Sequence, residues 1–124
     1  MATHRGIVLV IATCSALSLA TTGAFAHPRL VSATPAVGGT VPAAPDTVAL
    51  RFNERLESKF SSVIIRDSDG KQVDKGDPQL DKSDRRILRV SLPSLAAGVY
   101  KVEWQAVGAD GHRIEGDFTF RVDH

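Results

Sequence analysis

Short runs in which apolar and polar residues alternate recur along the chain after residue 27. In one of them Val48, Leu50 and Phe52 alternate with more polar neighbours, and the longest run starts at Gly98 and includes Trp104. A period of two is typical of β-strands that bury one face, because successive side chains point to opposite sides of a strand. The pattern predicts about seven short strands. They cover residues 29–33, 46–53, 62–66, 72–73, 87–92, 98–106 and 118–122.

Glycine, proline and charged residues mark the connections between these strands. Asp69-Gly70 predicts a hairpin, the proline- and glycine-rich residues 34–45 predict a connecting loop, and residues 74–85 predict a solvated, charged surface loop. No segment after residue 27 has the 3.6-residue period of a helix. These features predict an all-β fold, a small Greek-key antiparallel β-sandwich or barrel of immunoglobulin-like type. We expect Trp104 to anchor the core between its two sheets.

Residues 1–26 have the composition of a secretory signal peptide. Arg5 supplies a positive charge, residues 7–20 are mostly apolar, and residues 24–26 read Ala-Phe-Ala, a small-x-small cleavage site. The apolar run is too short, and too interrupted by polar residues, to span a membrane. We therefore expect cleavage after residue 26, a mature domain over residues 27–124, export to the periplasm, and no membrane insertion after processing.

Charge and sulfur content exclude several classes of function for the mature domain. The chain carries 15 Lys+Arg against 14 Asp+Glu, and this near balance gives no sign of nucleic-acid or anionic-membrane binding. The single cysteine, Cys14, and the single methionine, Met1, both precede residue 27. The mature domain therefore has no disulfide and no soft sulfur ligand for a metal.

Asp110 and His112 stand two residues apart in a glycine-flanked turn between the last two predicted strands. On extended backbone this spacing points both side chains to the same side, so a carboxylate oxygen and an imidazole nitrogen can converge on one ion. A turn aspartate next to a solvated histidine has the same pattern. The pair indicates a metal site only if a further ligand comes from elsewhere in the chain.

Cleavage after residue 26 would supply that ligand, because it gives His27 two nitrogen donors, the α-amine and the ring Nδ1. Pro28 has no backbone N–H, so the metal cannot complete its site with the next amide nitrogen. Adding the His112 imidazole gives three nitrogens, and Asp110 or Glu54 can supply an oxygen. Such a set suits Cu(II). The alternative is that His27 is merely the residue that follows the protease cut.

Three stretches carry a resemblance to a known family. They are HPRLVSATPAVGG after the predicted cleavage, LRFNERLE at the end of the second main strand, and AAGVYKVEWQAVGADGHRIEGDFTFRV. In these the chain resembles the CopC family of periplasmic copper-resistance proteins over essentially the whole mature domain. The resemblance implies a cupredoxin-like Greek-key fold and one Cu(II) per chain. The ligands that it implies are His27, Asp110 and His112, with the strand-end Glu54 accompanying the site in some members.

Members with two copper sites also carry a Met-rich loop with a histidine that holds Cu(I). The corresponding stretch here, DSDGKQVDKGDPQLDKS, has neither residue type, so we expect no Cu(I) site. The resemblance then implies an exported Cu(II)-binding protein that acts in copper resistance, buffering or delivery. Its expected partners are the copper ion and an inner-membrane copper transporter, and we expect a monomer.

Two other functions fit parts of the same pattern. An N-terminal histidine with a second histidine also resembles the histidine brace of copper-dependent polysaccharide oxygenases. Against that reading, the chain shows no evident flat aromatic face for a glycan, and carboxylates favour Cu(II) over Cu(I) and so hinder redox cycling. The other alternative is a metal-free, immunoglobulin-like adhesion or accessory module. With no evident nucleophile–base pair, we expect a binding protein and not an enzyme.

Overall fold

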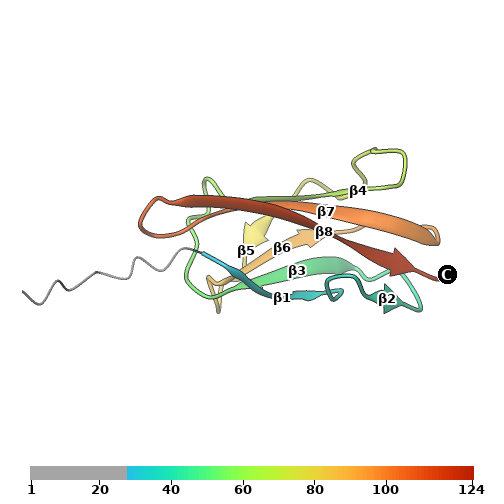
Figure 1. Cartoon of the computed structure of the whole chain (residues 1–124), viewed down its shortest axis with the longest axis horizontal. Helices are drawn as coiled ribbons and strands as arrows, with labels where there is room; N and C mark the ends of the chain where they lie inside the picture. Colours follow the sequence, from blue (N-terminus) through green and yellow to red (C-terminus); the bar gives the residue numbers. More distant parts are fainter. Residues whose placement is uncertain (1–27) are drawn as a thin grey trace, which may run out of the picture.

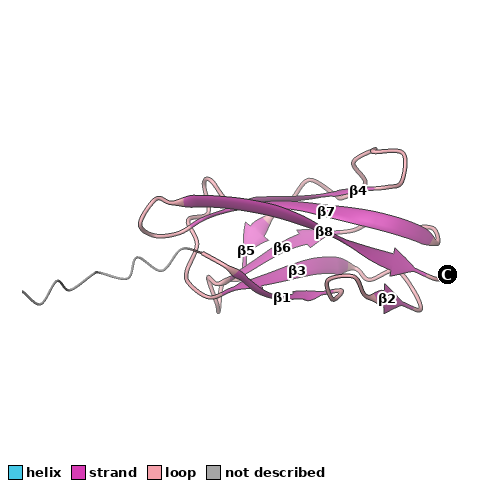
Figure 2. Cartoon of the chain, viewed as in Figure 1, coloured by secondary structure: helices cyan, strands magenta, loops and turns pink. Residues whose placement is uncertain are grey.

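The computed structural model describes residues 28–124, which form two packed β-sheets (Figures 1 and 2). The predicted signal peptide and His27 lie outside the described residues. Within them no helix is long and apolar enough to cross a membrane. The strands are β1 (Leu30–Thr34), β2 (Thr40–Val41), β3 (Thr47–Phe52), β4 (Ser62–Arg66), β5 (Gln79–Leu80), β6 (Ile87–Ser91), β7 (Gly98–Val107) and β8 (Arg113–Val122).

The two sheets have four strands each and do not close into a barrel. One sheet has the order β1-β3-β6-β5 and the other the order β2-β8-β7-β4. All pairs are antiparallel except β2 and β8, which run parallel where Thr40 lies opposite Arg121. The predicted fold class is therefore confirmed as a β-sandwich.

The core lies between the sheets and consists of the inward-facing residues that the alternation predicted. Val48, Leu50 and Phe52 of β3 are at most 1% exposed, whereas their neighbour Thr47 is exposed. From the opposite sheet Tyr100 stacks on Phe120, with ring centroids 5.6 Å apart. The other buried apolar residues are Leu56, Val63, Ile65, Leu88, Val90, Leu92, Val102, Ala106, Val107, Phe118 and Val122.

Trp104 packs against this core but is only partly buried, so it contributes less to the centre than the sequence predicted. Its ring meets Phe52 edge-on, with centroids 5.2 Å apart and planes at 70°. Its indole also covers Gly116, the residue opposite it on β8. A Cβ on Gly116 would lie 2.6 Å from Trp104 Cζ2. The tryptophan therefore occupies the space of a missing side chain on the neighbouring strand.

The strands that sequence analysis did not predict have identifiable causes. β2 and β5 are two residues long and lie inside the predicted loops at 34–45 and 74–85, because pairing with β8 and β6 orders stretches with no periodicity of their own. β8 begins at Arg113, five residues before the predicted start at residue 118. The first half of β8 was not predicted because one of its inward positions is Gly116, which interrupts the apolar alternation. The predicted strand at 72–73 is reduced to one bridge between Arg66 and Gln72.

The charged loop between β4 and β6 is held in place by its own aspartates. Asp67 Oδ1 accepts hydrogen bonds from the backbone N–H groups of Asp69 and Lys71, at 2.9 and 3.0 Å. Asp74 Oδ1 accepts one from Ile65 at 2.8 Å. Asp77, Asp81 and Asp84 accept backbone N–H groups in the same way. These bonds replace a sheet ladder where the chain has none.

Candidate metal centre

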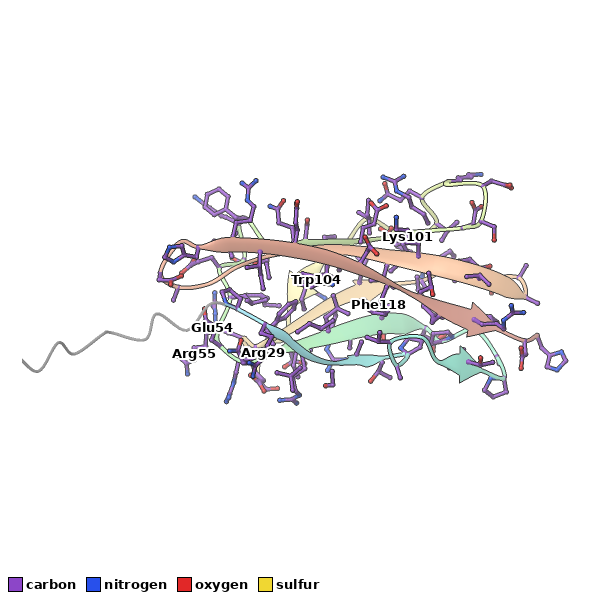
Figure 3. All side chains as sticks on the ribbon, viewed as in Figure 1. Arg29, Glu54, Arg55, Lys101, Trp104 and Phe118 are labelled. Carbon is purple, nitrogen blue, oxygen red and sulfur yellow. The ribbon has the colours of Figure 1, made fainter. Side chains whose placement is uncertain are left out.

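Three segments meet at one end of the sandwich: the entry to β1, the chain after β3, and the turn between β7 and β8 (Figure 1). The entry to β1 is fixed by Asn53. Its Oδ1 accepts a hydrogen bond from the Arg29 N–H at 2.6 Å, and its own N–H donates to the Arg29 carbonyl at 3.0 Å. Pro28 is fully buried. The first described residues are therefore held beside Glu54, which follows Asn53 (Figure 3).

The β7–β8 turn is closed by its own backbone. Gly108 N–H donates to the His112 carbonyl at 3.1 Å, and Gly111 N–H donates to the Gly108 carbonyl at 2.9 Å. Gly111 has a φ of 84°, a left-handed conformation that glycine adopts without strain. This turn brings Asp110 and His112 together, although their backbone is a turn and not the extended strand from which their proximity was predicted.

Asp110 and His112 bond directly to each other. The Asp110 carboxylate lies 2.8 Å from His112 Nδ1 through Oδ2 and accepts the His112 backbone N–H at 3.0 Å through Oδ1. The hydrogen bond to the ring, and then the one to the backbone, lower the pKa of Asp110. A neutral imidazole that donates from Nδ1 presents Nε2 as its lone-pair nitrogen. The pair thus selects the imidazole tautomer and the ring nitrogen able to bind a metal.

Gly108 is the point at which the three segments converge. A Cβ placed on Gly108 would collide with Glu54 Oε1 and would lie 3.1 Å from Pro28 Cγ and 3.2 Å from Asp110 Oδ1. Two carboxylates from segments far apart in the sequence therefore border one small volume beside the start of the described chain. Glu54, which is half-buried, is one of them, and Asp110 is the other.

Within residues 28–124 no group of three or more His, Cys, Asp or Glu side chains has the geometry of a metal site. The described donors at this end are two carboxylates and one imidazole. His27, the remaining predicted ligand, directly precedes the buried Pro28 and lies outside the described residues. The structure therefore joins Asp110 to His112 and places Glu54 and Asp110 around Gly108, and the contribution of His27 stays a prediction.

Two residues important to this geometry were not singled out from the sequence. Asn53 fixes Arg29 through its side chain, and Gly108 leaves space for Glu54. An asparagine at a strand end is a recognisable capping residue, but its partner is 24 positions away. No local signal distinguishes Gly108 from an ordinary turn glycine.

A shallow groove lies beside the β7–β8 turn. The odd-numbered residues of the turn line this groove, and they alternate along the chain with Gly108, Asp110 and His112. Phe60 at its rim is 58% exposed. The groove is lined by Glu57, Phe60, Val107, Ala109, Gly111 and Arg113.

A family model described as the CopC domain matches residues 30–123. The chain belongs to the CopC family. CopC proteins bind copper and act in copper resistance and transport, and the relatives found are not named as enzymes.

Individual CopC relatives agree in sequence and fold. Copper resistance protein C of Pseudomonas syringae pv. tomato is 37% identical over 111 residues, which cover 80% of this chain and 82% of that protein. The crystal structure of CopC from Methylosinus trichosporium OB3b superposes with a TM-score of 0.73 at 39% identity, covering 78% of this chain and 94% of that one. Copper transport protein CutJ of Bacillus subtilis is 34% identical over 99 residues, 79% of this chain but 18% of CutJ.

Proposed function

We propose that residues 27–124 are an exported, periplasmic protein that binds one Cu(II) as cargo, with residues 1–26 removed as a signal peptide. The ligands in this proposal are the His27 α-amine and imidazole, His112 Nε2 and an oxygen of Asp110, with Glu54 beside them. The observation that carries it is the burial of Pro28 against Gly108, next to Asp110. Because His27 directly precedes Pro28, its donors are one peptide bond from this cluster.

The donor chemistry favours Cu(II) over Cu(I). Amine and imidazole nitrogens with a carboxylate oxygen suit Cu(II), whereas Cu(I) prefers thiolate and thioether sulfur. The chain has one cysteine and one methionine, both before residue 27. Asp110 can serve the site in two ways, because each carboxylate oxygen has two lone pairs. It can hold the His112 ring through Nδ1, as it does in this structure, or it can turn away from the ring and give an oxygen to the metal bound at Nε2.

The test is a Cu(II) titration of protein that begins at His27, measured by competition with a chelator and by electron paramagnetic resonance. We expect one tight tetragonal site with nitrogen couplings. A form with one extra glycine before His27 should bind orders of magnitude more weakly, because the α-amine is no longer part of the histidine chelate. Circular dichroism of both forms serves as the folding control. Equal affinity of the two forms would contradict this ligand set.

For the role of the bound copper we propose delivery to an inner-membrane transporter by a monomeric carrier. The support is CutJ, a copper transport protein in which the region similar to this chain is a minor part of a longer protein. The proposal predicts that copper-loaded protein loses its metal faster to membranes containing such a transporter than to a small chelator of equal affinity. Equal rates would favour simple buffering.

A further inference from the structure

Gly108 occupies a position where a side chain would compete with a carboxylate. The space that a Cβ would take there is filled by Glu54 Oε1, with Pro28 and Asp110 on the other sides. Gly108 is buried and its φ lies outside the left-handed region, so its backbone would accept alanine. Position 108 therefore requires glycine because it has no side chain, and not because the backbone conformation is unusual.

The backbone around Gly108 is held on both sides by hydrogen bonds. It forms an antiparallel bridge with Leu56, and the Glu57 N–H donates to the Val107 carbonyl at 2.8 Å. The turn hydrogen bonds between Gly108, Gly111 and His112 hold it from the other side. The segment that follows Glu54 is thus tied to the strand that carries Gly108. A side chain added at 108 would displace the flexible carboxylate of Glu54 before it displaced this network.

We infer that Gly108 is a positioning residue that holds the Glu54 carboxylate at the candidate metal centre, an inference that rests on the proposed Cu(II) function. Two carboxylates kept this close to one point repel each other until a cation lies near them. The absence of a side chain at 108 therefore concentrates negative charge where the proposed copper ion would bind. Any larger residue at 108 moves Glu54 away and leaves Asp110 as the one carboxylate at this point.

A double-mutant cycle tests this inference in the mature protein. The variants are Gly108→Ala, Glu54→Ala and the double variant, compared by chelator competition for Cu(II). We expect Glu54→Ala to weaken binding about 10- to 100-fold, as is usual for groups that support metal ligands. Gly108→Ala should weaken it by a similar factor. The double variant should bind no more weakly than Glu54→Ala alone, because both changes remove the same carboxylate from the site.

Glu57→Ala is the matched control, because it removes the same charge three residues later, from a side chain that lines the groove instead. It should bind Cu(II) like the wild type. Wild-type affinity of Gly108→Ala or Glu54→Ala, or additive losses in the double variant, would overturn the inference. If Gly108→Ala does not fold, the double variant should fold, since removing the Glu54 carboxylate makes room for the new methyl group. Failure of both would also overturn it.

A metal-free measurement separates this inference from the proposed function. The ¹³C shift of the Glu54 carboxyl in the apoprotein should change in Gly108→Ala and remain unchanged in Glu57→Ala. An unchanged shift in Gly108→Ala would overturn the positioning role even if copper binds. Conversely, the wild-type protein could fail to bind Cu(II) while the Glu54 shift still changes in Gly108→Ala. That result would refute the proposed function and leave Gly108 as the residue that places Glu54.

Discussion

Asn53→Ala tests how the start of the domain is held at the candidate metal centre. The substitution removes the Oδ1 acceptor of the 2.6 Å hydrogen bond from the Arg29 N–H but retains the backbone bond from Asn53 N–H to the Arg29 carbonyl. One such hydrogen bond contributes about 0.5–1.5 kcal/mol net. If Cu(II) binds only when Pro28 is docked, this loss predicts a roughly two- to thirteenfold weaker affinity.

The direct assay is hydrogen exchange of the Arg29 amide. It should exchange faster in Asn53→Ala by a factor similar to the loss of copper affinity, because one local opening controls both. Amides of the β3–β6 ladder should be unaffected. Asn53→Asp is the matched control, since it retains an oxygen acceptor in the same position and should keep the Arg29 amide protected. Unchanged exchange in Asn53→Ala would refute the idea that this side chain holds the entry to β1.

Two further predictions concern stability. Gly116→Ala should destabilise the fold by about 1–3 kcal/mol, because the new methyl group would overlap the Trp104 indole; urea unfolding followed by the emission of this single tryptophan measures it, and the exposed Glu115→Ala should have little effect. Lowering the pH should also reduce stability. Hydrogen bonds from Ser83 lower the pKa of Asp81 from 3.8 to about 2, and the pKa values of Asp77, Asp84 and Asp110 are lowered as well. Carboxyl groups with depressed folded-state pKa values stabilise the fold above their unfolded pKa. Their contribution should be lost as the pH falls from about 4 towards 2, and a free energy of unfolding that stays constant over this interval would contradict the assignment.

The sequence predicted those strands that have a clear apolar pattern of their own. β3, β4 and β6 lie within one residue of their predicted limits, because β3 alternates between apolar and polar positions and β4 and β6 are short runs rich in isoleucine, leucine and valine. β2 and β5 were missed because two-residue strands are specified by their partners and not by their own pattern. The early part of β8 was missed because its inward position at Gly116 is filled by a side chain from another strand.

The candidate site also has one part that local sequence predicts and one part that depends on contacts between distant segments. The spacing of Asp110 and His112 predicted that their side chains would lie close together, and they do so in a short turn and not on extended backbone. Placing Glu54 against Gly108 requires the packing of β3 against the β7–β8 turn, and holding the entry to β1 requires Asn53 to find Arg29 across two strands. Local periodicity contains no information on contacts between distant segments. The sequence could therefore suggest Glu54 as a ligand, but not its position against Gly108.

The aspartates of the loop between β4 and β6 bear on which cations the domain attracts. Six aspartates in one loop could offer oxygen ligands to Ca²⁺ or Mg²⁺, which prefer carboxylates. Here Asp67, Asp74 and Asp81 already accept hydrogen bonds from backbone N–H groups. An alkaline-earth ion would have to disrupt the loop to gain a full oxygen shell. The loop therefore offers abundant hard cations no ready set of oxygen ligands.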